Sequence, residues 1–391
     1  MENRPISGII CEFNPLHNGH KKLLEFASNG GKTPVVCILS GNFVQRGDAA
    51  LFDKWTRCRA ALACGADLVV ELPLSWAMSG AERFAYGGVS LAWAAGCTQL
   101  VFGSECGDTA LLGKTAAYLN SPDFSHDLRT APVEEQALPF AARRERTVAR
   151  RLGDVAAQTI HTPNNILAVE YCKAIASLHT NMTPRTILRQ GVAHDKPAQG
   201  NSASASALRA ILLSENKGAA AAYMPRKAAE IFSSATMASI DRLEIAILCR
   251  LRTAKPEDFS KTPDVREGLE NRILAAARQA TSLQELYDAV KSKRYSHARI
   301  RRVILSFFLG IENQPQVPPY LRVLGMNATG ALLLKNARLP VITRAAQLRT
   351  MNYMCQSVFH LESRADDLYA LAQPIPGIAG SNEQHGMIVI R

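Results

Sequence analysis

The sequence lacks the long apolar runs of a membrane protein, since no window approaches the roughly 20 consecutive apolar residues that span a bilayer. Its first residues lack the charged and apolar regions of a signal peptide, and repeats and low-complexity tracts are absent. We therefore expect a cytoplasmic protein with no membrane partner. Nothing in the sequence implies a protein partner.

The nine cysteines lack the spacing of a metal site or a disulfide framework. They are scattered without a Cys-x-x-Cys pair, which argues against a structural zinc ion and against disulfide bonds. No acidic cluster stands out either, so no metal ligands are predicted in the protein. We expect reduced, mostly buried thiols.

Positive charge is what the chain has in excess. It carries 45 lysines and arginines against 34 acidic residues, a formal net charge of +11 over 391 residues. Such a surplus favours nucleic acid or an acidic membrane surface as a partner, although many enzymes are basic without a binding reason. The length suffices for two domains of roughly 100–200 residues each.

The first part of the chain alternates apolar strands with helices. Strands are predicted at 6–12, 35–40, 67–72, 99–102 and 185–189. Near-continuous apolar strands separated by helices are typical of a parallel sheet covered on both faces, the α/β class. Ligands of such sheets bind beyond the carboxyl ends of the strands.

From about residue 216 this alternation stops and helical spacing takes over, which predicts an α-rich second domain. We divide the chain into a catalytic domain, 1–215, and an α-rich domain, 216–391. A charged helix is predicted at 133–152, and the architecture of 315–391 cannot be read from the sequence. Segments with helical spacing in the second domain are 242–252, 265–280, 283–293 and 297–309.

The most informative segment is residues 8–20, Gly-Ile-Ile-Cys-Glu-Phe-Asn-Pro-Leu-His-Asn-Gly-His. An apolar strand runs into a turn that brings His17 and His20 to the start of a helix, where backbone N–H groups and the helix dipole attract anions. Two imidazoles can bind a polyphosphate there and stabilise a departing pyrophosphate. A pair of surface histidines beside a turn is the alternative. The pattern His-x-Gly-His resembles the signature of the nucleotidyltransferase superfamily, whose members release pyrophosphate from ATP.

A polar loop follows the second predicted strand, and we interpret it as an active-site loop that contacts acetate or phosphate. A solvated loop is the alternative. In the helix after it, Lys54 and Arg57 face either the site or solvent. The loop contains four candidate site residues, Ser40, Gly41, Asn42 and Arg46.

Two later strand ends and two helix starts carry further candidates. Gly103 would let the backbone approach a nucleotide, whereas Glu105 is equally well explained as a helix cap. Asn164 begins a helix, where a capping role is a sufficient alternative. A second helix start places Ser204, Ser206 and Arg209 toward one anion, which resembles the second phosphate motif of nucleotidyltransferases, Ser-Ser-Thr-x-x-Arg.

The densest basic run is residues 291–302 of the second domain. Tyr295 and His297 lie among its cations, and aromatic rings beside cations suit single-stranded RNA, whose bases can stack. A solvated helix face is the alternative. The candidate tRNA contacts are Arg294, Arg299, Arg301 and Arg302.

Several motifs occur in one order along the chain, namely 12–20, 39–48, 53–55, 65–73, 102–105 and 163–167. Together with the basic run and residues 320–327, they resemble the tRNA(Met) cytidine acetate ligase family over most of the chain. The resemblance implies a Rossmann-like HUP nucleotidyltransferase domain followed by an α-rich tRNA-binding domain. Two departures are a short stretch at 191–195 and Ser206, where threonine is common.

The family activates acetate with ATP and acetylates the exocyclic amine of the wobble cytidine of elongator tRNA(Met), giving N(4)-acetylcytidine. Mg²⁺ is expected to be held mainly by phosphates and water. The resemblance implies ATP contacts from Ile10, Cys11, Glu12, Phe13, Asn14, Pro15, Leu16, His17, Asn18, Gly19, His20, Lys21, Gly103, Asn164, Arg189 and Gln190.

This chemistry is coherent because acetate is a poor acyl donor and the cytosine amine is a poor nucleophile. Forming acetyl-adenylate first divides one difficult step into two easier ones. Two other functions stay open: a small-molecule adenylyltransferase that makes a coenzyme or dinucleotide, and a non-catalytic RNA-binding protein. The sequence identifies no general base for the amine and leaves anticodon discrimination and oligomeric state undefined.

Overall fold

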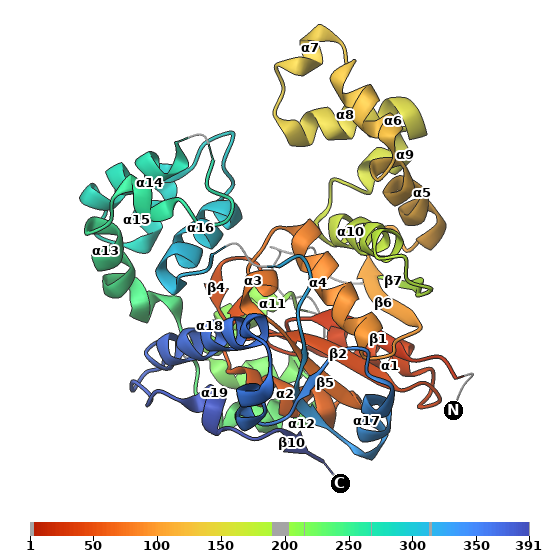
Figure 1. Cartoon of the computed structure of the whole chain (residues 1–391), viewed down its shortest axis with the longest axis vertical. Helices are drawn as coiled ribbons and strands as arrows, with labels where there is room; N and C mark the ends of the chain where they lie inside the picture. The colour runs from red at the N-terminus through yellow and green to blue at the C-terminus, as the bar shows by residue number, and fades with distance from the viewer. Residues whose placement is uncertain (1–3, 190–202, 215, 267, 313–314, 391) are drawn as a thin grey trace.

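The computed structural model describes residues 4–189, 203–214, 216–266, 268–312 and 315–390 (Figure 1). An eight-stranded sheet forms its centre, with the order β10-β8-β5-β2-β1-β6-β7 and with β9 paired to β8. Its strands are β1 (Ser7–Cys11), β2 (Val35–Ser40), β5 (Leu68–Leu72), β6 (Gln99–Ser104), β7 (Thr183–Leu188), β8 (Leu321–Met326), β9 (Val341–Ile342) and β10 (Ile388–Val389).

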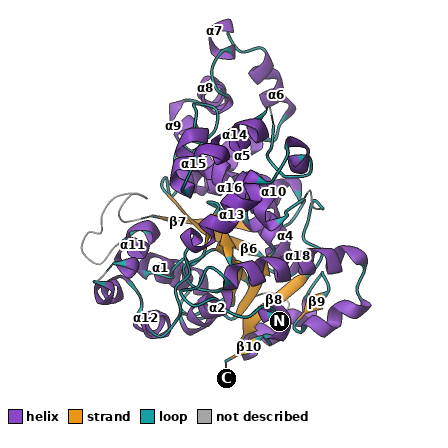
Figure 2. Ribbon diagram, turned by 90° about the vertical axis from the view of Figure 1, so that its left-hand side faces the viewer, coloured by secondary structure: helices purple, strands orange, loops and turns teal. Residues whose placement is uncertain are grey.

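Helices surround this sheet in both views (Figures 1 and 2). Those before residue 215 are α1 (Asn18–Ser28), α2 (Lys54–Ala63), α3 (Leu74–Ala77), α4 (Ala81–Ala94), α5 (Thr109–Leu119), α6 (Pro122–Arg129), α7 (Val133–Gln136), α8 (Phe140–Leu152), α9 (Asp154–Gln158), α10 (Pro163–Ser177) and α11 (Ala205–Leu213). Those after it are α12 (Arg226–Ser233), α13 (Glu244–Arg252), α14 (Leu269–Gln279), α15 (Leu283–Val290), α16 (His297–Leu309), α17 (Ala328–Leu333), α18 (Tyr353–Ala370) and α19 (Ser381–Gln384). Short 3-10 helices are η1 (Lys217–Tyr223), η2 (Ile240–Leu243), η3 (Pro256–Phe259), η4 (Leu334–Asn336) and η5 (Ala345–Thr350).

The predicted α/β class and parallel sheet are confirmed. β1 pairs in parallel with β2 and β6, β2 with β5, and β6 with β7. Because side chains alternate between the faces of a strand, Ile9 and Cys37 pack on one face with α1 and α2. Ile38 and Val70 pack on the other face with α4 and α10. Burial on both faces explains why these strands are apolar throughout.

The C-terminal part of the chain completes the same sheet. β8 lies antiparallel to β5, and β10 lies parallel to β8. The predicted helices after residue 240 are present as α13 to α16 (teal in Figure 1), whose apolar core also includes side chains of α3, α18 and the hairpin after β2. The division of the chain at residue 215 stays a prediction, with three strands beyond it, β8, β9 and β10, belonging to the central sheet.

Two local expectations were wrong. The helix predicted at 133–152 is divided into α7 and α8, because Pro139 has no N–H to donate and disfavours helical backbone at Leu138. The polar loop after β2 contains a short antiparallel hairpin, β3 (Phe43–Val44) with β4 (Asp48–Ala49). Within the described part of the chain, no helix has both the length and the apolar character needed to cross a membrane.

The contact between α17 and the sheet predicts a strong effect of one methyl group. A Cβ on Gly330 would lie 2.1 Å from the carbonyl oxygen of Asp67, so we expect Gly330→Ala to lower the free energy of unfolding by about 1–3 kcal/mol. The matched control is Gly113→Ala in α5, where a Cβ meets nothing within 4 Å and stability should rise by about 0.5–1 kcal/mol. Urea unfolding measures both variants. Equal stability of the two variants would contradict the close approach of α17.

Candidate active site at the carboxyl edge of the sheet

His17 and His20 begin α1 with their rings stacked, at a centroid separation of 3.8 Å. Nδ1 of His17 accepts from the N–H of Gly19 at 3.0 Å, and Nδ1 of His20 accepts from the N–H of His17 at 3.3 Å. Both Nδ1 atoms are therefore acceptors, so the proton of each neutral ring is on Nε2. The two rings are thus oriented as hydrogen-bond donors at the start of a helix.

The surroundings of His20 keep its ring uncharged. Burial lowers the pKa of His20 well below its usual 6.5, and the nearby His17 and Arg189 lower it further against the opposing backbone carbonyl of Pro15. The ring is therefore neutral at physiological pH. The influence of Arg189 also shows that the residue after β7 lies near the histidine pair.

The other residues of the turn are largely enclosed by the core. Asn14 accepts from the N–H of Leu51 at 2.8 Å through Oδ1, and so holds the turn to the segment before α2. The side chains of Cys11, Phe13, Asn14, Pro15 and Leu16 are buried, and that of Ile10 is partly buried. Any contact of these residues with a nucleotide would therefore come mainly from their backbone.

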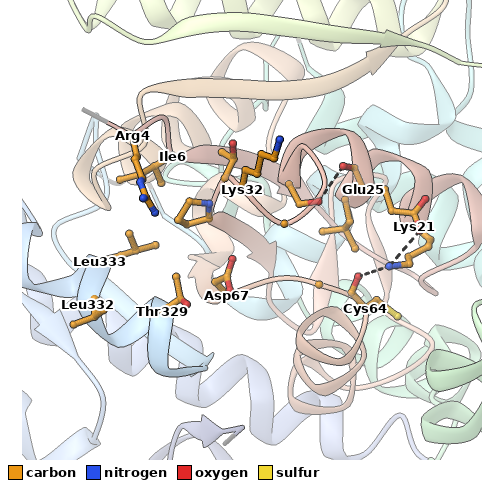
Figure 3. Close-up of a pocket in the computed structure, with 16 residues that line it drawn as sticks. Arg4, Ile6, Lys21, Glu25, Lys32, Cys64, Asp67, Thr329, Leu332 and Leu333 are labelled. Carbon is orange, nitrogen blue, oxygen red and sulfur yellow. Dashed lines mark hydrogen bonds and ion pairs between the residues drawn. The ribbon is translucent and has the colours of Figure 1, made fainter. Parts of the chain in front are cut away.

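Two predicted ATP contacts are engaged elsewhere. Asn18 donates to the carbonyl of Ala222 at 3.2 Å. Lys21 donates to the carbonyl of Cys64 at 3.1 Å and pairs with Glu25 at 3.4 Å. Figure 3 shows Lys21 at a cavity of about 410 Å³ that is lined by residues before β1, β2 and β5. This cavity is at the amino edge of the sheet, opposite to the edge where α/β sheets bind ligands.

Three of the later candidates do come together. Arg189 donates to Oδ1 of Asn164 at 3.1 Å, and a Cβ on Gly103 would lie 3.0 Å from Cγ of Arg189. Glu105 accepts from the backbone and side-chain N–H groups of Asn164 at 3.2 and 2.6 Å, which makes it the cap of α10. Burial alone would raise the pKa of Glu105. The hydrogen bonds that its carboxylate accepts lower the pKa by a larger amount, so the net shift is downward. Gln190 lies outside the described residues.

The second phosphate motif lies against the first. Ser204 caps α11 by accepting from the N–H of Ala207 at 3.1 Å. Arg209 donates to the carbonyl of Asn14 at 2.9 Å and to the hydroxyl of Ser206 at 3.4 Å. Segments almost 200 residues apart in sequence therefore meet at one edge, as expected of two halves of one anion site.

Arg57 is a structural residue rather than a ligand-binding or solvated one. Its side chain is fully buried and donates to four backbone carbonyls, those of Glu12 at 2.7 Å, Ser40 at 2.9 Å, Phe52 at 2.8 Å and Gly41. These carbonyls belong to the ends of β1 and β2 and to both ends of the polar loop. One guanidinium thus positions the loop on the sheet.

Lys54 is likewise buried and binds no solvent. Its Nζ lies 2.7 Å from Glu71, 2.8 Å from Asp366 and 2.8 Å from Oδ1 of Asn382. Asn42, a predicted site residue, accepts from the N–H of Lys54 at 2.7 Å and donates to Asp366 at 2.9 Å. Asn42 therefore holds the loop to α18 and has its side-chain amide occupied.

The surroundings of this cluster raise the pKa of two of its carboxyls. Burial and the neighbouring Glu71 raise the pKa of Glu362 well above its usual value against the opposing Lys54. Burial also raises the pKa of Asp366 to about 6. A second buried cation, Arg322, donates to the carbonyl of Asn382 at 3.2 Å. Sequence reasoning missed this cluster, although a glutamate inside the apolar strand β5 was a signal.

The basic helix α16 lies directly on the polar loop. Arg302 donates to the carbonyl of Gln45 at 3.3 Å. Gly47 has a φ of +72°, and a Cβ there would lie 2.6 Å from the backbone nitrogen of Arg302, so only glycine permits this approach. Arg46, at the tip of the hairpin, is exposed.

Most of the predicted tRNA contacts have structural partners. Arg299 donates to a backbone carbonyl at 3.0 Å, and Arg301 lies over the ring of Tyr287 at 5.0 Å. Tyr295 is buried and donates its hydroxyl to a backbone carbonyl, so the expectation that its ring stacks on RNA bases was wrong. The exposed cations of the run are Lys291, Lys293 and Arg294.

Comparisons with known proteins agree with this geometry. The model of the HIGH Nucleotidyl Transferase family matches residues 5–384. A tRNA(Met) cytidine acetate ligase of Caldanaerobacter subterraneus is 36% identical, with 93% of this chain and 94% of that protein covered. The one of Clostridium perfringens is 32% identical, with 94% and 96% covered. The crystal structure of Thermotoga maritima TmcAL bound with alpha-thio ATP has a TM-score of 0.89 and 26% identity, covering 98% of this chain and 99% of that one.

The buried cluster predicts that loss of Lys54 destabilises the whole protein. Lys54→Met leaves buried carboxylates without their cation, so the free energy of unfolding should fall by about 3–5 kcal/mol. The control is Arg226→Met, which removes one partner of the exposed pair between Arg226 and Glu230 and should cost less than about 1 kcal/mol. Urea unfolding followed by circular dichroism measures both. Equal losses in the two variants would contradict the structural role of Lys54.

Proposed function

The chain belongs to the HIGH nucleotidyl transferase family, and from this premise we propose that it is an ATP-dependent tRNA(Met) cytidine acetate ligase. It activates acetate as acetyl-adenylate and transfers the acetyl group to the exocyclic amine of the wobble cytidine of elongator tRNA(Met). The observation that carries the proposal is the His17–His20 pair at the carboxyl edge of the sheet, in a chain similar over nearly its whole length to ligases with this name.

In the first step, a carboxylate oxygen of acetate attacks the α-phosphorus of ATP and pyrophosphate leaves. Nε2–H groups of His17 and His20 donate to the phosphates, and Arg209 with the start of α11 stabilises the same charge. The described residues contain no group of three or more acidic, histidine or cysteine side chains that could hold a metal ion. We therefore assign Mg²⁺ to the phosphates and water, as expected for this small, strongly hydrated ion.

In the second step, the cytidine N4 attacks the acetyl carbon and AMP leaves. The base must be unstacked from the anticodon loop to reach the carboxyl edge, as is normal for recognition of single-stranded RNA. The helices α13 to α16 support this step by their position, because α16 rests on the polar loop beside the phosphate motifs. Their exposed cations are placed to contact the tRNA backbone next to the site.

A small-molecule adenylyltransferase would share the histidine motif, but its reaction does not require basic helices such as α13 to α16 beside the active-site loop. A non-catalytic RNA-binding protein would have no need for the convergence of His17, His20 and Arg209. The ligase accounts for both features, so we prefer it. Acetate as the specific carboxylate and the tRNA as acceptor are the parts that the next experiments test.

The first experiment is acetate-dependent exchange between ATP and labelled pyrophosphate. The wild-type enzyme should catalyse exchange with acetate in the absence of tRNA, because acetyl-adenylate formation is reversible. The double variant His17→Ala, His20→Ala should lose at least 100-fold of this rate, the usual effect of removing preorganised donors. His126→Ala, an exposed histidine of α6, is the matched control and should retain the rate. Absence of exchange in the wild type would refute the ligase activity.

The second experiment measures the salt dependence of tRNA binding. The triple variant Lys291→Gln, Lys293→Gln, Arg294→Gln should bind tRNA more weakly. The plot of log K against log salt should become shallower, its slope decreasing in magnitude by about 0.7–0.9 for each lost phosphate contact. A charge-matched control removes three exposed cations that lie outside the helices α13 to α16, namely Lys32, Lys335 and Arg349. An unchanged slope in the variant of Lys291, Lys293 and Arg294 would mean that these side chains face solvent and do not contact tRNA.

A further inference from the structure

Glu12 directly follows β1, and its carboxylate has no role in the steps above. The register of β1 and β2 places Ile10 beside Ile38 and Cys11 beside Leu39. Because side chains two residues apart share a face, Glu12 and Ser40 leave neighbouring strands on the same side of the sheet. Their backbone carbonyls are both bound by Arg57, at 2.7 and 2.9 Å, which fixes the two residues next to one another.

The carboxylate of Glu12 is held by one firm contact and surrounded by cations. Its Oε1 accepts from the N–H of Gln45 at 2.7 Å. Burial raises the pKa of Glu12, while this hydrogen bond and the nearby Arg209, Arg57 and Arg46 lower it, with a net shift upward. A carboxylate among the arginines of a phosphate site repels the substrate, so it needs a chemical reason to be there.

Ser40 provides an independent sign that this point faces a reacting group. Its side chain is fully buried, and among the described residues its hydroxyl has no hydrogen-bond partner. A buried polar atom of this kind costs stability unless something else satisfies it. Ser40 and Glu12 thus leave neighbouring strands on one side of the sheet at its carboxyl edge, and the buried hydroxyl of Ser40 is open to a further partner there.

We propose that Glu12 is the general base of acetyl transfer. This deepens the ligase function proposed above and rests on it. N4 of cytidine forms a bond with the acetyl carbon, and the bond from that carbon to the phosphate oxygen breaks with its electron pair leaving on AMP. The proton lost by N4 passes to the carboxylate of Glu12. The acetate-activation step transfers no proton and therefore has no need of this group.

The histidines and the tyrosine nearby are poorer bases. Nδ1 of His17 and of His20 accepts a backbone N–H, and Nε2 carries the proton of the neutral ring, so neither ring can take another without losing its cap. Burial and the nearby Glu12 raise the pKa of Tyr171 far above neutrality, so its phenol holds its proton. Burial also raises the pKa of Asp48 against the nearby Arg209 and Arg301, as it does for Glu12, so the experiment below compares the two carboxylates.

The experiment separates the two half-reactions in Glu12→Gln, which keeps an acceptor for the N–H of Gln45 but cannot take up a proton. The ratio of acetyl transfer to acetate-dependent pyrophosphate exchange should fall by roughly 100-fold or more relative to wild type. In the wild type, the transfer rate should rise with pH as the Glu12 carboxyl ionises and then level off. In Glu12→Gln the transfer rate should not show this rise with pH. In Glu12→Asp the rise should remain, with a lower transfer rate.

Asp48→Asn is the matched control, because it removes another partly buried carboxylate near Arg209 and should leave the ratio of transfer to exchange unchanged. Unimpaired transfer by Glu12→Gln would overturn the inference while leaving the ligase function intact. Equal loss of exchange and transfer in both Glu12→Gln and Glu12→Asp would assign Glu12 a positioning role through Gln45 and would also overturn it. Failure of the proposed function itself is recognised by the absence of exchange in the wild type.

Discussion

The guanidinium of Arg57 is the constraint on which the site depends. It binds carbonyls at the ends of β1 and β2 and at both ends of the polar loop, and these are the segments that carry Glu12, Ser40 and the histidine turn. Arginine suits this task because its planar group offers five fixed donors and stays charged when buried. Four carbonyl dipoles offset the cost of removing that charge from water. The two strand ends and the polar loop are therefore held together at this edge of the sheet.

The cluster around Lys54 extends this rigidity to the C-terminal half of the chain. Lys54 follows the loop directly, while Asp366 and Asn382 come from α18 and α19. The backbone of α16 also packs closely against Gly47 in the polar loop. The polar loop is thus contacted by elements that are more than 250 residues away in sequence. This arrangement couples the nucleotide site physically to the part of the molecule that we propose contacts tRNA.

Sequence reasoning succeeded where a local pattern decides the outcome. The strands β1, β2, β5, β6 and β7 follow from apolar runs, and the start of a helix at the histidine turn follows from turn chemistry; both are present, whereas β8, β9 and β10 were not predicted. It failed where burial is decided by distant segments. Nothing near Lys54 or Arg57 reveals that α18 and the strand ends enclose them, and nothing near Tyr295 reveals that its ring is covered. Likewise, Lys21 follows the histidines closely but points to the carboxyl end of α2.

The neutrality of His20 matters for turnover as well as for binding. A doubly charged histidine pair in the free enzyme would bind ATP and pyrophosphate almost equally, and such uniform binding does not accelerate the chemical step. In the proposed mechanism, a neutral ring donates a hydrogen bond without adding a fixed charge, and such a bond strengthens as charge develops on the leaving pyrophosphate. Glu12 acts in the second proposed step instead, where its carboxylate takes up the proton that N4 loses.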